Sequence, residues 1–546
     1  TNYNVGVGLD AGKSITTGKE HTLIGGLCGD ALTSGDRSVA IGTNALSADT
    51  QGSRNVAVGY DSLKTQNFTT GTNAYNVGVG YNTGGSITTG IHNSILGGET
   101  GSSLTTGESN TAFGYQSLRD DTLGSFSVAI GDRALKFQNF TTATSSYNVA
   151  VGSSAGLNIT TGTNNTLVGG LAGDALTTAT DNVAVGRNAL SADTKGTFTV
   201  AVGTNALASQ NQTTATTTYN VAVGLNAGTS VTTGIQNTLV GGLCGDAITA
   251  GETNVAVGYG ALSENTLSSR NVAIGNLALL NHNTTAGNGY NTAMGYNAGQ
   301  AITDGTNNTI IGGLAGDAMT NSRFNTVVGT SALSASCGDS NTAIGYAALT
   351  VCTGQTNIGV GTNAGDSLTS GSNNILIGVN SDATSNTGSN AIVLGTNITA
   401  DSNNFSFGKA SNVVTNDFDT DANWSRSSDQ RLKKNIANST LGLSFINALR
   451  PVKYNWKPSN ELDSSDSQLA HLYKENAEDN EMNTEATMYN FIAQEVKAAL
   501  DAAGVSDFSG WSEDQWGVQQ VSREMFIMPL VKAVQELTAR IEALES

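Results

Sequence analysis

Asn220-Val221-Ala222-Val223-Gly224 is one copy of a phrase that recurs along the first three quarters of the chain. The same order of Asn, apolar, small, apolar and Gly begins at Asn4, Asn55, Asn182 and Asn271. The closing Gly recurs at spacings of 17, 17, 17 and 21 residues, and this cycle then repeats. A period this short and regular indicates a solenoid, in which each repeat is one coil and only stacking buries the apolar side chains.

Within the phrase, Val221 and Val223 alternate with Ala222, which is the period of a short strand. We expect the two Val side chains to fill the interior of the coil and Ala222 to face a neighbouring chain. Gly224 would form the turn, where a positive φ costs little. In the second half of the coil, sequences such as 188–190 (NAL) predict a second strand. Each coil would bury only about three apolar side chains, so association of several chains would supply the missing core.

The repeats set the domain organisation. They predict 24 coils over residues 1–408, a shaft that would be about 110 Å long at ~4.8 Å per stacked strand. All Pro and Trp residues follow residue 408, and this change in composition predicts a linker at 409–427 and a second domain at 428–546. The fold class is therefore mainly β. Super-repeats of four coils begin at Asn4, Asn76, Asn148, Asn220 and Asn291, spaced 72 residues apart and then 71, and a shorter block begins at Asn357.

Composition excludes several classes of function. The net charge of −19 argues against a nucleic-acid partner, since phosphate binding needs Lys and Arg. No run of 18 apolar residues exists, so membrane insertion is not expected. The segment 417–421 resembles the start of a calcium loop, but Ala422 and Ser428 stand where such a loop needs Gly and Glu. No metal site and no cofactor are predicted.

The four cysteines lie in the shaft. Cys28 and Cys244 occupy the slot that Ala172 fills in a sister super-repeat, so we expect small buried residues. Cys337 and Cys352 lie about one coil apart; two free thiols are expected there, and a disulfide is the alternative.

Every fourth coil carries an insertion, at residues 65–76, 137–148, 209–220 and 280–291. Aromatic residues recur in these insertions, which would project from the shaft, and one interpretation is that the aromatics contact a host-surface receptor such as a glycan. In the alternative, each Tyr packs over its own coil. The candidate binding residues are Phe68, Tyr75, Phe140, Tyr147, Tyr219 and Tyr290.

The pattern NVAVGxxAL over residues 1–408 resembles the head repeats of trimeric autotransporter adhesins, the YadA-like left-handed β-roll. Similar repeats occur in fibres of tailed bacteriophages and of some large viruses. The resemblance implies a homotrimer of parallel chains packed around a threefold axis. The 17-residue period is longer than that of the shortest such repeats, which implies a longer outer loop in each coil.

The C-terminal region carries three sequence blocks in order, at 428–433 (SDQRLK), 449–456 (LRPVKYNW) and 490–496 (NFIAQEV). They resemble the endosialidase-type intramolecular chaperone at the C-terminus of phage tail spikes and fibres. The resemblance implies a small α+β domain that trimerises, drives folding of the fibre and then cuts itself off.

The same resemblance assigns the roles. Ser428 would be the nucleophile, Lys433 its partner and Asp429 a supporting residue, and the bond cut would join Ser427 and Ser428. A Ser hydroxyl is a weak nucleophile that needs a base, and a Lys can accept the proton where burial favours its neutral amine. The only enzymology expected is thus a single-turnover serine endopeptidase with no external substrate.

The last segment predicts a helix at 526–545 with a heptad seam. The alternation of β-branched residues and Leu favours two strands by itself, whereas the resemblance implies three. The alternative is that the seam packs on its own domain. The proposed trimerisation residues are Ile527, Leu530, Val534, Leu537, Ile541 and Leu544.

Together these features favour a trimeric viral fibre, either a phage tail fibre or a virion surface fibre, located on the virion or outside the cell. Its partners would be a host-surface receptor and, at its N-terminal side, a virion or tail attachment protein. A bacterial cell-surface trimeric adhesin is the alternative. A polysaccharide-degrading spike is less favoured, because no paired carboxylates stand out in the shaft and a catalytic domain would interrupt the 17-residue period.

Overall fold

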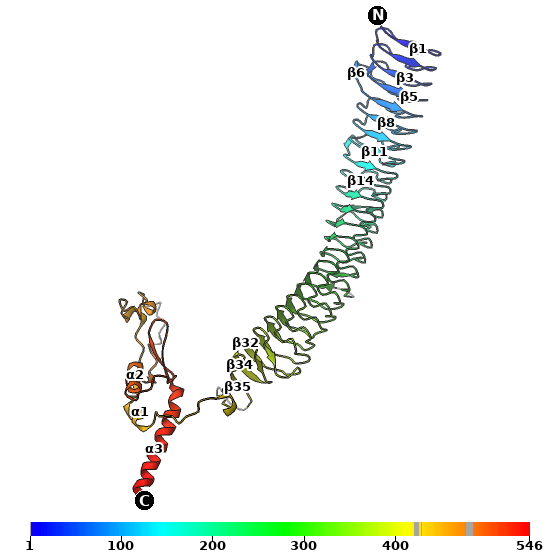
Figure 1. Ribbon diagram of the computed structural model, residues 1–546. Helices are drawn as coiled ribbons and strands as arrows, with labels where there is room; N and C mark the ends of the chain where they lie inside the picture. Colours follow the sequence, from blue (N-terminus) through cyan, green and yellow to red (C-terminus); the bar gives the residue numbers. More distant parts are fainter. Residues whose placement is uncertain (1, 285–286, 420–424, 427, 477–483) are drawn as a thin grey trace. The chain divides into compact units, whose positions relative to one another are not determined.

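The computed structural model describes residues 2–284, 287–419, 425–426, 428–476 and 484–546. It divides the chain into two compact units, Thr1–Ser427 and Ser428–Ser546. The first unit is a stack of coils, and the second contains the helices (Figure 1).

The stack is built on a 26-stranded sheet in which only the last two strands run antiparallel. Each coil contributes a short strand that pairs in parallel with the strand of the next coil, as in Val221↔Thr238. The mainly β solenoid is thus confirmed. Its parallel strands are β1 (Val5–Val7), β2 (Thr22–Ile24), β3 (Val39–Ile41), β5 (Val56–Val58), β7 (Val77–Val79), β8 (Ser94–Leu96), β9 (Thr111–Phe113), β11 (Val128–Ile130), β13 (Val149–Val151), β14 (Thr166–Val168), β15 (Val183–Val185), β17 (Val200–Val202), β19 (Val221–Val223), β20 (Thr238–Val240), β21 (Val255–Val257), β23 (Val272–Ile274), β25 (Thr292–Met294), β26 (Thr309–Ile311), β27 (Thr326–Val328), β28 (Thr342–Ile344), β29 (Ile358–Val360), β30 (Ile375–Ile377), β32 (Ile392–Thr396) and β34 (Asn404–Lys409).

Short two-residue strands pair in parallel beside the insertions and in the last coils. The pairs are β4 (Gly52–Ser53) with β6 (Thr72–Asn73), β10 (Gly124–Ser125) with β12 (Thr144–Ser145), β16 (Gly196–Thr197) with β18 (Thr216–Thr217), β22 (Ser268–Ser269) with β24 (Gly287–Asn288), and β31 (Asp382–Ala383) with β33 (Thr399–Ala400).

The strand residues face the opposite way from the prediction. Ala222 is fully buried, whereas Val221 and Val223 are only half-buried on the outer face of β19. The alternation was correct but the assignment of its two faces was wrong. In the next coil a fully buried Leu239 occupies the position of Ala222, so the narrow interior accepts a large residue in one coil and small residues in the coils on either side.

The predicted second strand at 188–190 is also wrong. Asn188 and Leu190 have φ angles of 57° and 55°, which belong to the left-handed region and not to a strand. The side chain of Leu190 is fully buried, so the turn aims this apolar residue into the core of the coil.

Gly224 does form the turn, with a φ of 141°. A Cβ atom there would lie 2.4 Å from the carbonyl oxygen of Gly241 in the next coil. The Gly is therefore required by close stacking of the coils as well as by its backbone conformation.

A ladder of buried polar side chains runs through the stack at the first position of the phrase. In a representative rung, Asn237 Oδ1 accepts a hydrogen bond from the backbone N–H of Asn254 at 3.0 Å, and Nδ2 donates to the Gly251 carbonyl at 2.9 Å. Asn237 is fully buried. The amide thus satisfies a backbone donor and a backbone acceptor of two different coils.

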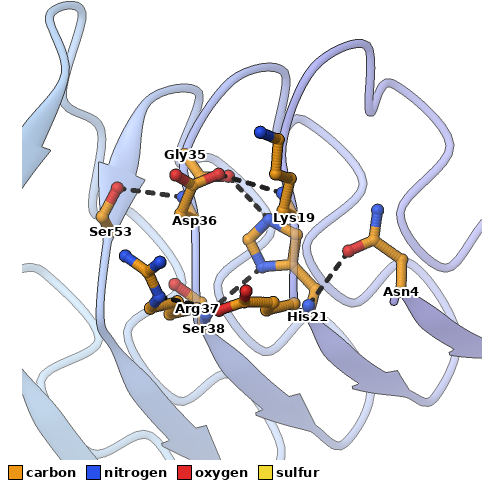
Figure 2. Close-up of polar contacts among 9 residues, drawn as sticks. Asn4, Lys19, His21, Gly35, Asp36, Arg37, Ser38 and Ser53 are labelled. Atoms are coloured by element: carbon orange, nitrogen blue, oxygen red, sulfur yellow. Dashed lines mark hydrogen bonds and ion pairs between the residues drawn. The ribbon is translucent and has the colours of Figure 1, made fainter. Parts of the chain in front are cut away.

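His21 takes the place of Asn in the second rung (Figure 2). Its backbone N–H donates to Asn4 Oδ1, its Nδ1 accepts from the Ser38 N–H at 3.3 Å, and its Nε2 donates to the Gly35 carbonyl at 2.7 Å. These bonds require the neutral tautomer protonated on Nε2. The imidazole therefore reproduces both bonds of an Asn side chain.

The predicted linker at 409–427 is not simply a linker. β35 (Asn412–Asp417) folds back antiparallel on β34, and β36 (Ser425–Arg426) pairs antiparallel with β35. Because the last parallel strand has no further coil to pair with, this hairpin covers its edge.

The second unit contains three α-helices, α1 (Leu443–Ala448), α2 (Ala493–Ala502) and α3 (Ile527–Glu545), within the residues that the structure describes. Two antiparallel hairpins accompany them, β37 (Val452–Tyr454) with β38 (Met488–Asn490) and β39 (Trp511–Glu513) with β40 (Gln519–Val521). Short 3-10 helices lie at Gln430–Leu432, Ser459–Glu461, Ala470–Leu472 and Arg523–Phe526. In the described part of this unit, the buried apolar cluster consists of Leu441, Phe445, Val496, Ala499, Leu500 and Phe526.

The first half of α3 packs against this core. Pro529 and Ala533 are buried, and Glu536 Oε2 accepts the backbone N–H of Leu443 at 2.8 Å, at the start of α1. Among the described helices, none is both long and apolar enough to cross a membrane.

Candidate functional site

Ser428 and Lys433 lie together at the start of the second unit. Lys433 Nζ donates a hydrogen bond to Ser428 Oγ over 2.6 Å. The 3-10 turn Gln430–Leu432 lies between them and returns the chain on itself, so that two residues five positions apart meet. The structure thus brings together the two residues that the sequence assigned to the dyad.

Asp429 supports this turn rather than the dyad directly. Its Oδ1 accepts the backbone N–H of Arg431 at 2.8 Å and caps the 3-10 turn. Its carboxylate also accepts from the Arg431 guanidinium, with Nη2 at 2.6 Å from Oδ2. This hydrogen bond from the Arg431 side chain lowers the pKa of Asp429, and the same pairing raises the pKa of Arg431.

Arg431 is the site residue that sequence reasoning missed. Its only signal was its place two residues after Asp429, the spacing at which an Asp side chain caps a turn.

The dyad is exposed in the single chain. Every residue from 428 to 440 is exposed, including the apolar Leu432 at 72 % and Ile436 at 64 %. Lys433 donates to Ser428 in this arrangement, whereas a base must accept the Ser proton. Attack of Oγ on the preceding carbonyl would therefore require Lys433 to act as the proton acceptor. Ser427, on the other side of the predicted cleavage bond, lies outside the described residues.

An ion pair ties two of the three C-terminal sequence blocks together. Arg450 and Glu495 are joined through both guanidinium and carboxylate ends, with Nε at 3.1 Å from Oε2. Arg450 precedes β37, and Glu495 lies in the first turn of α2. The ion pair therefore links the chain just before β37 to the start of α2. The second and third sequence blocks therefore meet in space.

The predicted trimerisation seam is exposed on α3. The exposed fractions are 53 % for Ile527, 52 % for Leu530, 54 % for Val534, 43 % for Leu537, 53 % for Ile541 and 86 % for Leu544. The helix contacts its own unit through a different face, that of Pro529 and Ala533. Six apolar side chains at heptad spacing are thus left available to a partner.

The candidate receptor-binding aromatics divide into two groups. Phe68 and Phe140 are only 6 % and 4 % exposed, so the prediction that they project from the shaft is wrong. The Tyr residues of the insertions are about half exposed: Tyr75, Tyr147, Tyr219 and Tyr290.

These Tyr residues also pack on the preceding coil. The rings of Tyr147 and Phe126 stack at 5.4 Å, and the Tyr219 and Phe198 rings lie 5.7 Å apart. The Arg54 guanidinium lies 5.4 Å from the Tyr75 ring centroid. The Tyr75 ring also lies 5.9 Å from the His92 ring of the following coil. Contacts with neighbouring coils thus cover part of each ring and leave the rest in solvent.

All four cysteines are free thiols, and Cys28 and Cys244 are fully buried. Burial raises the pKa of Cys244 to about 12 and that of Cys352 to about 11, which disfavours the reactive thiolate. No group of three metal-ligating side chains occurs within the described ranges. Thr420 and Asp421 of the calcium-like segment lie outside those ranges.

Comparison with known proteins bears on the C-terminal unit. No curated protein and no solved structure matched the chain. The family model described as chaperone of endosialidase matches residues 428–505, the segment that begins at the dyad Ser and includes the Arg450–Glu495 pair.

Proposed function

We propose that this chain is a trimeric viral fibre, of a phage tail or a virion surface, that attaches to the host surface. Its C-terminal unit acts as an intramolecular chaperone that aligns three chains and then cuts itself off between Ser427 and Ser428. The shaft lies outside the cell on the virion and joins a virion or tail protein at its N-terminal side.

The observation that carries the proposal is an apolar stripe along the shaft, formed by the third residue of each three-residue parallel strand. This residue is apolar in every one of those strands, and none of them is buried. Leu96 is 48 % exposed, Met294 43 % and Phe113 40 %. Monomeric soluble proteins rarely expose a continuous apolar patch of more than a few hundred Å², so a stripe of this length supports coverage by other copies of the chain.

The C-terminal unit supports the same conclusion. The match of residues 428–505 to the endosialidase chaperone family favours three chains over two. The exposed seam on α3 offers an apolar contact for them.

A shaft of this kind needs such a device. Parallel strands with non-local pairing fold slowly, and their unpaired edges aggregate. Coils this similar can also pair out of register by one coil or one super-repeat. Alignment of three C-terminal ends before the shaft folds prevents both errors, and cleavage afterwards makes the assembly kinetically irreversible.

Electrophoresis of the purified full-length protein tests the self-cleavage. Wild type is expected to give two bands of roughly three quarters and one quarter of the chain, because residue 428 begins the last quarter. Ser428→Ala and Lys433→Met are expected to give one band. Lys434→Met, which removes the neighbouring amine, is the matched control and should cleave as wild type. A single band from wild type, or two bands from Ser428→Ala, would contradict the assignment.

A further inference from the structure

The super-repeats allow an internal comparison, because equivalent positions in the first three lie 72 residues apart. Positions that the copies share serve the solenoid. A position at which one copy alone carries a reactive or aromatic side chain has a local role, especially when several such positions meet in space.

Such positions meet where the second super-repeat joins the third. A surface groove of about 810 Å³ runs across consecutive coils there. Its lining includes Asp120, Phe137, Asn139, Asn158, Thr160 and Thr177.

The first and third copies lack the side chains that give this groove its chemistry, although the fourth copy carries a carboxylate, Glu264, at the position of Asp120. Phe137 is replaced by Thr65 in the first copy and by Ser209 in the third. Asp120 is replaced by Ala48 and Ala192, and Arg119 by Ser47 and Ser191. The coil does not need these side chains, since both sister copies fold in the same register without them.

The Arg119–Asp120 pair and Phe137 form one cluster. Arg119 Nε and Nη2 donate to the two oxygens of Asp120 at 2.6 and 3.0 Å. The Arg119 guanidinium lies 6.0 Å from the Phe137 ring centroid, and Lys136 Nζ lies 5.0 Å from it. Phe137 is 37 % exposed. A bidentate ion pair therefore fixes a carboxylate beside an accessible aromatic ring.

Two amides of the groove each keep one polar atom free among the contacts of the described residues. Asn139 is shared by the copies: its Oδ1 accepts from Thr122 Oγ1 at 3.0 Å, as Asn67 and Asn211 do from Thr50 and Thr194, and this solenoid bond leaves Nδ2 as a donor. Asn158 Nδ2 donates to the Asp174 carbonyl at 2.8 Å, which leaves Oδ1 as an acceptor. A held donor and a held acceptor thus stand near the aromatic ring and the carboxylate.

We propose that this groove binds an oligosaccharide that lies along the axis of the shaft. A sugar ring packs its apolar face on Phe137, and its hydroxyls bond Asn139 Nδ2, Asn158 Oδ1 and the Asp120 carboxylate. Planar apolar contact combined with paired donors and acceptors suits a polyhydroxylated ligand. The proposal rests on the proposed function and names the class of receptor and its place on the fibre.

The groove stays accessible when the apolar stripe is covered. Its residues lie ten to twelve positions after the ladder residue of their coil, as Phe137 does after Ser127, whereas the stripe lies three positions after it. In a 17-residue coil these places are about half a turn apart. Chains joined through the stripe therefore leave the groove towards solvent.

Binding of the full-length protein to a printed array of defined neutral and uronic-acid-containing oligosaccharides tests the proposal. The decisive variant is Arg119→Ser with Asp120→Ala and Phe137→Ser, which installs the residues of the third copy and so should fold. It is expected to lose binding at least about tenfold, which corresponds to about 1.4 kcal/mol. The control Tyr346→Thr removes an exposed aromatic outside the groove, at a position that Thr330 and Thr362 fill in the adjacent coils, and should bind as wild type.

Equal binding by the triple variant and wild type overturns the proposal, as does a wild type that binds nothing on the array. Particle mass measured on the same samples separates the two proposals. A trimer that does not bind contradicts the groove alone, whereas a single chain whose binding depends on Phe137 contradicts the fibre alone.

Discussion

Gln66 Nε2 donates a hydrogen bond of 2.7 Å to Asp49 Oδ2 in the preceding coil, and both side chains are fully buried. The other carboxylate oxygen accepts the backbone N–H groups of Gly52 and Phe68 at 3.0 and 3.1 Å. Neutral donors alone thus satisfy this buried charge. The arrangement recurs one super-repeat later, where Gln138 donates to Asp121 at 2.6 Å.

Burial raises the pKa of Asp49, and the hydrogen bond from Gln66 opposes this rise. A carboxyl with a raised pKa stabilises the fold fully at pH values below its unfolded pKa of about 3.9 and loses that contribution as the pH rises through the folded pKa. The charged form is therefore the costly one, and the donors around it matter most near neutral pH.

Gln66→Leu should consequently destabilise its coil by about 1–3 kcal/mol at pH 7 and by less at pH 4, because a hydrogen bond to a charged group is worth more than one to a neutral group. Hydrogen exchange of the Gly52 and Phe68 amides at the two pH values, corrected for the intrinsic exchange rate, measures this. Asn93→Leu is the control, since Asn93 bonds Asn110 and Gly107 and no carboxylate, and its cost should not change with pH. Equal costs of Gln66→Leu at both pH values would refute the interpretation.

His21→Asn should change the free energy of unfolding of the second coil by no more than about 0.5 kcal/mol, because Asn makes both bonds of this rung elsewhere in the ladder. His21→Leu should cost about 1–3 kcal/mol, because it leaves the Ser38 N–H and the Gly35 carbonyl without their partner. Exchange protection of the Ser38 amide reports both effects. A loss of protection that is the same for Asn and Leu would show that the imidazole has another role.

Asp429→Ala should slow self-cleavage by roughly 10–100-fold, because it releases the turn that holds Ser428 and Lys433 in contact. Asp429→Asn keeps an acceptor for the Arg431 N–H and should slow cleavage less. The measurement is the rate at which the short fragment appears. Cleavage of Asp429→Ala at the wild-type rate would mean that the cap does not position the dyad.

Val223→Asp should weaken the association of chains by several kcal/mol, because it would bury an unpaired charge in the apolar stripe. Gln236→Asp is the matched control, since Asp181 occupies the same position in another coil. Particle mass and thermal midpoint measured together test this. If the two variants behave alike, the stripe is not an interface.

The sequence predicted the structure correctly at positions where only one residue type satisfies the local geometry. Gly224 marked the turn because no other residue fits against Gly241, and the period alone predicted the solenoid. The faces of β19 were assigned wrongly because an alternation of Val and Ala has two equally regular readings, and only the width of the coil decides between them. Phe68 was expected in solvent because its insertion looks like a surface loop, yet its side chain is only 6 % exposed.

The dyad shows a similar division. Ser428 and Lys433 were identified through their resemblance to a family, and the 3-10 turn explains how they meet. Arg431 was missed because its role depends on the geometry of the Asp429 side chain, which spacing alone does not specify.

The most direct test of the whole account is the number of chains in the native particle. Native mass spectrometry of the uncleaved Ser428→Ala protein should give three chains per particle, and Val223→Asp in that background should shift the population towards single chains. A particle of one or two chains would contradict the central claim that the apolar stripe is covered by two further copies.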